Sequence, residues 1–142
     1  MKYAKLVYGR NPEQLRSQYY VNIGDWMQTF ALEHLYQEME INPGDIVSIE
    51  HTDLTTYSGE PVILPMQGWF GLIKGRDIFP LSQNITPVFL GFHCVTRAFY
   101  QKAHLDFYRK YAPIGCRDEA TYAMMTRYGV PAFVSQCHLV KV

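Results

Sequence analysis

Two ionisable side chains, far apart in the sequence, are the best candidates for chemistry. Asp25 stands at the start of an amphipathic stretch, and Arg117 directly follows a short apolar run. A carboxylate such as Asp25 can orient or deprotonate a hydroxyl group. A guanidinium between a strand end and a helix start can hold a carboxylate or phosphate as a fork, beside free helix N–H groups. The pair therefore suggests catalysis on a hydroxyl and an anion.

Simpler roles fit the same residues. Asn22 or Asp25 can cap the N–H groups of the helix, and Gly24 can supply the backbone freedom of the turn before it. Asp25 also suits the positive end of the helix dipole. Arg117 could pair with Asp25 or with one of the two acids that follow it. The sequence alone leaves these alternatives open.

Other residue types associated with catalysis give weaker signals. The pairs His93-Cys94 and Cys137-His138 lack the spacing of a structural zinc site, so we expect no metal. A nucleophilic Cys94 or Cys116 would need a nearby base and an electropositive pocket, and buried inert thiols are the simpler expectation. No Gly-x-Gly-x-x-Gly or Walker A run is present in the sequence, so a standard dinucleotide or ATP phosphate loop is not expected.

The elements that position these residues alternate between strands and helices. We expect strands at 3–8, 46–49, 61–65, 87–92, 114–116 and 132–135. We expect helices from the 22–25 turn to about residue 39, over 96–111, and from an Asp118 cap to about residue 128. Such alternation predicts an α/β fold, a Rossmann-like, three-layer and mostly parallel sheet with right-handed crossovers.

The first helix carries an apolar stripe. The residues spaced by four, with two aromatics beside them, are Met27, Ala31, Leu35, Met39, Trp26 and Phe30. This stripe predicts the face that docks on the sheet.

Loops that follow parallel strands open on one edge of the sheet, where ligands bind in open α/β folds. We expect 9–25, 67–70, His93 and Arg117 to converge there. In 67–70, Gly68 and the large Trp69 follow a strand end and could approach a ligand closely, or Trp69 and Phe70 could cover the core. The expected substrate-binding residues are Asn22, Gly24, Gly68, Trp69 and His93.

The totals narrow the class of protein. A chain of 142 residues with 48% hydrophobic and 18% charged residues should form one globular domain. Lys+Arg and Asp+Glu both number 13, which argues against nucleic acid as the main partner. The three cysteines, the lack of a leader-like start and the lack of a long apolar run favour a cytoplasmic protein with no transmembrane segment.

Several segments together resemble one family. Residues 22–31, NIGDWMQTFA, resemble the Asn-x-Gly-Asp signature near the start of polysaccharide pyruvyl transferases. Residues 66–70, MQGWF, resemble an Asn-Gly-Trp-Phe segment of one branch, with Gln67 in place of Asn. Residues 113–118, PIGCRD, and 128–137, YGVPAFVSQC, resemble further segments of that branch in the same order, with Gln136 where Gly is frequent.

The resemblance implies the N-terminal half of a glycosyltransferase-B type fold. It implies transfer of the enolpyruvyl group of phosphoenolpyruvate to a sugar hydroxyl, forming a ketal on a surface polysaccharide or its lipid-linked precursor. Asp25 would act on the acceptor hydroxyl or shape the site, and Arg117 would hold an anionic group of the donor. Phosphoenolpyruvate would be a donor substrate, and no cofactor is implied.

The family has a second half, which supplies a histidine and basic residues around the donor. The similar segments here all match the first half, so the partner expected for this chain is the second half or another copy of itself, besides the saccharide acceptor. Two alternatives remain from the residues alone. One is a non-catalytic α/β binding or interaction module, and the other is half of a glycosyltransferase that uses a nucleotide sugar.

Overall fold

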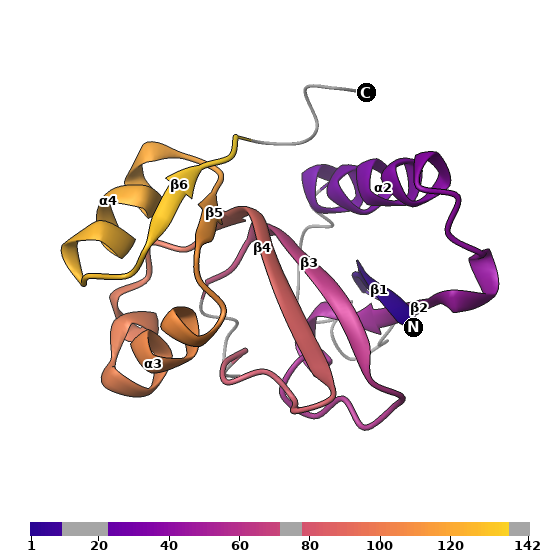
Figure 1. Cartoon of the computed structure of the whole chain (residues 1–142), viewed down its shortest axis with the longest axis horizontal. Helices are drawn as coiled ribbons and strands as arrows, with labels where there is room; N and C mark the ends of the chain where they lie inside the picture. Colours follow the sequence, from indigo (N-terminus) through magenta and orange to yellow (C-terminus); the bar gives the residue numbers. More distant parts are fainter. Residues whose placement is uncertain (10–22, 72–77, 137–142) are drawn as a thin grey trace.

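The computed structural model describes residues 1–9, 23–71 and 78–136 (Figure 1). A six-stranded sheet runs through the molecule in the order β2-β1-β3-β4-β5-β6, and every adjacent pair is parallel. The strands are β1 (Lys2–Val7), β2 (Ile46–Glu50), β3 (Val62–Trp69), β4 (Ile85–His93), β5 (Ile114–Cys116) and β6 (Ala132–Val134). The helices are α2 (Ile23–Glu38), α3 (Lys102–Lys110) and α4 (Glu119–Arg127), with short 3₁₀ turns at Pro43–Asp45, His51–Asp53 and Arg97–Tyr100.

The strand order defines where the chain reverses direction across the sheet. From β1 the chain steps outward to β2, and from β3 onward it steps the other way to β6. Right-handed crossovers in opposite directions place their helices on opposite faces. Figure 1 shows α2 on one side of the sheet and α3 on the other. The predicted Rossmann-like, three-layer, parallel fold is confirmed, and its switch point lies between β1 and β3.

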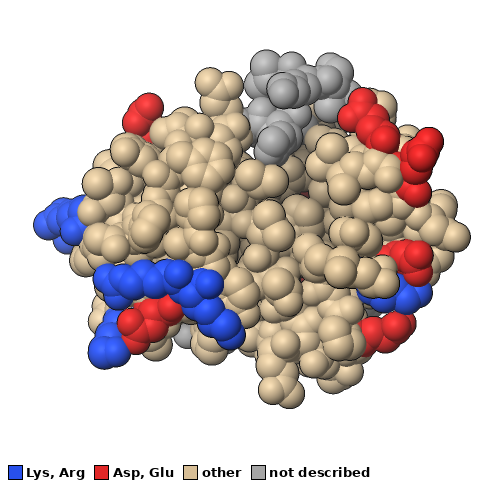
Figure 2. Space-filling model, in the orientation of Figure 1, with Lys and Arg blue, Asp and Glu red and all other residues tan. Residues whose placement is uncertain are grey.

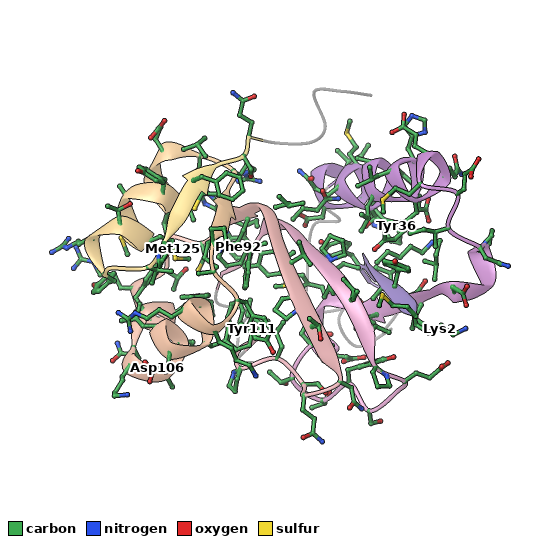
Figure 3. All side chains as sticks on the ribbon, viewed as in Figure 1. Lys2, Tyr36, Phe92, Asp106, Tyr111 and Met125 are labelled. Carbon is green, nitrogen blue, oxygen red and sulfur yellow. The ribbon has the colours of Figure 1, made fainter. Side chains whose placement is uncertain are left out.

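Aromatic side chains fill the core between β4 and α3. Phe92 is fully buried and stacks on Phe70 at 5.1 Å between ring centroids, and Phe79 meets Phe92 edge-on at 6.2 Å. Phe92 lies near the centre of the molecule, while Tyr36 lies on the side of α2 that faces the sheet (Figure 3). The Tyr36 hydroxyl donates to the Ala4 carbonyl oxygen at 2.7 Å, which ties α2 to β1. These contacts hold the sheet and the first helix in a fixed relation.

Helix α2 buries a different face from the one that its sequence predicts. The residues it buries are Gln28, Thr29, Ala31, Leu32 and Tyr36. Of the predicted stripe only Ala31 is buried, whereas Met27, Phe30, Leu35 and Met39 are exposed. The buried Thr29 side chain bonds to the sheet, donating to the Leu6 carbonyl oxygen at 2.6 Å. Such hydrogen bonds make a polar face compatible with burial, which hydrophobic periodicity cannot detect.

Two expectations near the site also need correction. Gly24 lies within the first turn of α2 and is not part of a preceding turn, because the helix begins at Ile23. Asn22 and most of the expected 9–21 loop fall outside the described residues. The expected 67–70 loop is instead the end of strand β3, which continues to Trp69.

Smaller differences occur in the second half. The expected 96–111 helix is divided into a 3₁₀ turn and α3. Strand β4 is longer than the expected 87–92, since it begins at Ile85 and ends at His93. In the described ranges, no helix combines the length and apolar character that a bilayer crossing requires.

The end of β3 is shaped by a bulge at Gly68. The register between β3 and β4 shifts between Met66 and Gly68, and Gly68 has a φ of 107°. A residue with a side chain rarely adopts this conformation. Beyond the bulge, Trp69 pairs in register with His93. The bulge at Gly68 thus changes the direction in which the Trp69 side chain points, as bulges commonly do.

We expect Gly68→Ala to destabilise the fold by about 1–3 kcal/mol, because the strain lies in the backbone. An added Cβ would meet only the Gln28 side chain, at an ordinary 3.7 Å. Gly129→Ala is the comparison, since Gly129 also has a positive φ of 68° and no atom within 4 Å of an added Cβ, so it should be destabilised by backbone strain alone. Urea unfolding measures both variants. A Gly68→Ala protein as stable as the parent would contradict the assigned strain.

Candidate functional site

The carboxyl ends of the parallel strands bring the predicted residues to one edge. Trp69 and His93 end adjacent strands and are paired in register. The Arg117 backbone N–H donates to the Phe92 carbonyl oxygen at 2.9 Å, so Arg117 lies beside the end of β4. The first turn of α2, which holds Asp25, is the end of that helix nearest to β4 and β5 in Figure 1. We call this group of residues the carboxyl-edge site.

Asp25 and Arg117 are electrostatic neighbours, although they are separated by most of the chain. Burial raises the pKa of the Asp25 carboxyl above its ordinary value, and the positive charge of Arg117 opposes that rise. Asp25 also acts on Tyr8 at the end of β1: burial, then the charges of Asp25 and Glu50, raise the pKa of the Tyr8 phenol. The two predicted catalytic residues are therefore close enough for their charges to interact, and Asp25 is partly withdrawn from water.

Arg117 also lies close to a second acid, Asp118. Its Nε lies 3.6 Å from Oδ2 of Asp118, and the same oxygen accepts a hydrogen bond from Nδ1 of His93. The side chain of His93 is 16% exposed and that of Asp118 is 34% exposed. Asp25, Arg117, Asp118 and His93 thus form a series of alternating charges or potential charges along the edge.

Asp118 has two tasks at the start of α4. Its Oδ1 accepts a hydrogen bond from the Thr121 backbone N–H at 2.9 Å, which confirms the predicted N-cap. Burial tends to raise the pKa of Asp118, but the hydrogen bonds from Thr121 and His93 outweigh burial and lower it. The carboxylate is therefore ionised near neutral pH. The sequence identified the cap but not the contact with His93, because the two residues belong to different strand–loop connections.

Of the remaining predicted residues, Trp69 lies at the surface and the two glycines shape the backbone. Trp69 is 44% exposed and borders His93, whereas Phe70 is buried in the core. An added Cβ at Gly71 would overlap the Trp69 ring, at 2.0 Å, so the indole lies over a surface that only glycine leaves open. Gly68 serves the bulge and Gly24 the helix backbone. Asn22 cannot be placed, because it lies outside the described residues.

A ring stack that the sequence did not predict lies beneath this edge. His51 is stacked between Tyr8 and Phe70, with both pairs of ring centroids 5.3 Å apart. Its Nε2 is buried, and no described residue offers it a hydrogen bond. Burial lowers the pKa of His51 to about 4, against a weaker opposing effect of the Trp69 backbone. His51 is consequently neutral and inaccessible, and acts as a packing residue.

A small hollow lies at the switch point between α2 and strands β1 and β3. Its cavity volume is about 10 Å³. The residues that line it include Tyr8, Gln28, Thr29 and Gln67. The Gln67 side-chain amide donates to the Gln28 carbonyl oxygen at 2.5 Å and closes this region toward the helix. This volume suits about one water molecule. It is too small for a sugar, so the candidate site is the edge above it.

Thiol and metal chemistry receive no support from the described residues. Cys94 and Cys116 are free and buried, and burial raises the pKa of their thiols to about 11 and about 12. Both thiols are therefore protonated near neutral pH and unsuited to nucleophilic attack. Within 1–9, 23–71 and 78–136, no group of three or more potential ligands could hold a metal ion. Cys137 and His138 lie outside these ranges.

Charged side chains are scattered on the face shown in Figure 2. Basic side chains gather over α3, where Asp106 pairs with Lys102 and Arg109, and acidic ones gather over α2. The middle of this face carries neither sign among its described residues. This face therefore offers no continuous basic surface of the type that binds a phosphate backbone.

The carboxyl-edge site combines a fixed cation with two groups that can exchange protons. Arg117 can hold an anionic group, Asp25 has a raised carboxyl pKa, and His93 is anchored through one ring nitrogen. This combination suits the binding of an anionic donor next to a hydroxyl that loses a proton. Comparison of the chain with family models, with curated proteins and with solved structures gave no match.

We expect His51→Phe to remove a pH-dependent loss of stability. The folded pKa of about 4 lies below the unfolded value of 6.5, so the unfolded state binds more protons between these values. The contribution of neutral His51 to the free energy of unfolding is complete above the unfolded pKa and declines as pH falls. At about pH 5 the free energy of unfolding is lower by about 2 kcal/mol.

Urea unfolding near pH 5 and near pH 7.5 measures the difference. His51→Phe keeps the ring stack and should show a smaller decrease than the parent at the lower pH. His34→Gln, at a side chain that is 54% exposed, is the control and should retain the decrease. An equal decrease in the parent and in His51→Phe would show that His51 is not held neutral.

Proposed function

We propose that this chain forms the Asp25–Arg117 part of a polysaccharide pyruvyl transferase site. The donor is phosphoenolpyruvate and the acceptor is a hydroxyl-bearing saccharide, free or linked to a lipid. Arg117 binds an anionic group of the donor. Asp25 acts on the acceptor hydroxyl or shapes the site around it. A second half of the fold, or a second copy of the chain, completes the site.

The observation that carries the proposal is the electrostatic interaction between Asp25 and Arg117, in which the Arg117 charge lowers the pKa of the Asp25 carboxyl. The resemblance stated from the sequence assigns these two residues to one site, and their distance along the chain gives no local reason for them to meet. The parallel sheet and its switch point provide a second argument, because ligands bind at this edge of open α/β folds. Both arguments concern the same few side chains.

The reaction requires groups that bind anions and move protons. Two acceptor hydroxyls form two C–O bonds to the central carbon of phosphoenolpyruvate, and its bond to the phosphate oxygen breaks. One hydroxyl proton ends on the methylene carbon, which becomes a methyl group, and the other leaves with inorganic phosphate. Arg117 offsets the negative charge of the donor. The pKa of the Asp25 carboxyl is raised toward neutral pH, and a carboxyl exchanges protons best when its pKa lies near the working pH.

A non-catalytic α/β interaction module is the second candidate. The observation in its favour is on α2, where Ile23 is 75% exposed, Phe30 58% and Met27 47%. An apolar helix face in water is uncommon unless another molecule covers it. Such a module would bind neither phosphoenolpyruvate nor a nucleotide sugar.

We expect phosphoenolpyruvate to bind the chain and Arg117→Ala to weaken this binding roughly 10- to 100-fold, the loss typical of a charged hydrogen bond. Isothermal titration calorimetry measures the affinity, with a thermal-shift assay as a second readout. Arg127→Ala, an exposed position in the last turn of α4, makes the same charge change away from the edge and should bind as the parent does.

Nucleotide sugars provide the comparison ligands. Binding of a nucleotide sugar without phosphoenolpyruvate would favour a glycosyltransferase. Binding of neither ligand, together with a stable oligomer in sedimentation, would favour the interaction module. Equal donor affinities of Arg117→Ala and Arg127→Ala would remove Arg117 from the proposed donor site.

A further inference from the structure

The contact between His93 and Asp118 has a defined polarity. Asp118 uses Oδ1 to cap α4 and Oδ2 to face Nδ1 of His93. A carboxylate oxygen can only accept, so Nδ1 must carry the proton. Thr121 Oγ1 lies 3.3 Å from the same nitrogen and accepts from the Cys94 backbone N–H at 3.2 Å. The ring is therefore held on its Nδ1 side by α4 and by the end of β4.

The other ring nitrogen is open. In the described part of the chain, Nε2 of His93 makes no hydrogen bond, and it is not among the buried polar atoms that lack a partner. Nε2 of His51 is among those atoms. His51 follows β2 and His93 ends β4 at the same edge of the sheet, and the two histidines differ in this respect: the ring of His51 is enclosed in a stack, and His93 presents a free nitrogen.

We propose that Asp118 is a positioning residue that fixes the His93 tautomer, so that Nε2 of His93 serves as a proton acceptor in the carboxyl-edge site. The identity of the substrate rests on the function proposed above. In that reaction two hydroxyl protons leave the acceptor, one for the donor methylene carbon and one for the released phosphate. With Nδ1 carrying the proton, the Nε2 of a neutral His93 at the end of β4 takes one of them and passes it on.

The geometry explains why the acid must be at position 118. A neutral imidazole accepts a proton only on the nitrogen that lacks one, and the partner of the other nitrogen decides which that is. The same Asp118 carboxylate also lies 3.6 Å from Nε of Arg117. One side chain therefore orients both the imidazole and the guanidinium, and ties both to the first turn of α4.

The tautomer can be read by NMR of the imidazole nitrogens, at about pH 8, where an ordinary histidine is neutral. We expect Nδ1–H in the parent. In D118N, the oxygen of the amide keeps the cap, because Asn is a good N-cap residue. Its NH₂ group then faces Nδ1, so His93 should change to Nε2–H.

D118S is the second variant, in case D118N folds poorly. Ser also caps helices but is too short to hold the ring, so the His93 signals should lose the pure Nδ1–H signature. His34, exposed on α2, reports on the method and should keep the same signals in all three proteins. An Nε2–H tautomer in the parent, or an unchanged tautomer in D118N, would overturn the proposal.

A second measurement places Nε2 in the site. Diethyl pyrocarbonate modifies accessible unprotonated imidazoles, and mass spectrometry identifies each modified histidine. We expect His93 to react in the parent, to react several-fold more slowly in D118N, and to be protected several-fold by phosphoenolpyruvate. His34 should react equally in every case, and His51 should not react.

The outcomes separate the two proposals. If phosphoenolpyruvate binds in calorimetry but does not protect His93, the role of His93 is wrong and the proposed function stands. If phosphoenolpyruvate does not bind, the proposed function fails and the substrate-level role of His93 fails with it. The Nδ1–H tautomer and its dependence on Asp118 are then still decided by the NMR signals alone.

Discussion

The parallel pairing of the strands is the constraint on which the site depends. Because all six strands run the same way, every residue that follows a strand is brought to one edge of the sheet. The β3–β4 pairing sets Trp69 beside His93, and the backbone bond from Arg117 to Phe92 sets the end of β5 beside them. A side-chain constellation assembled in this way needs no local sequence motif. It needs only the correct strand order and register.

Side chains that perform structural tasks also define the candidate chemistry. Asp118 caps α4 through one oxygen and holds His93 through the other. Gly68 relieves a backbone conformation that other residues resist, and by doing so directs Trp69 outward. The polar atoms of the edge are thus anchored to elements whose own stability depends on them. A site supported in this way is preorganised, which electrostatic catalysis requires.

Burial distinguishes the groups of the edge that can react from those that cannot. His51, Cys94 and Cys116 contain reactive atom types, but burial holds the histidine neutral and the thiols protonated. Asp25 is only partly withdrawn from water and still feels the charge of Arg117. His93 keeps one nitrogen free while the other is bonded. The same residue types therefore have different chemical capacities, according to their depth below the edge.

The sequence by itself determined the α/β class, the approximate strand positions and the Asp118 cap, because these follow from alternation and capping, which are local patterns. The tertiary structure alone decided which face of α2 is buried, since Thr29 donates to the Leu6 carbonyl oxygen of β1 and the Gln28 carbonyl oxygen accepts from Gln67 of β3. It also decided the extension of β3 to Trp69, the His51 stack and the contact of His93 with Asp118. Each of these depends on atoms contributed by segments that are distant in the sequence. A local pattern of residue types does not show which distant groups will meet.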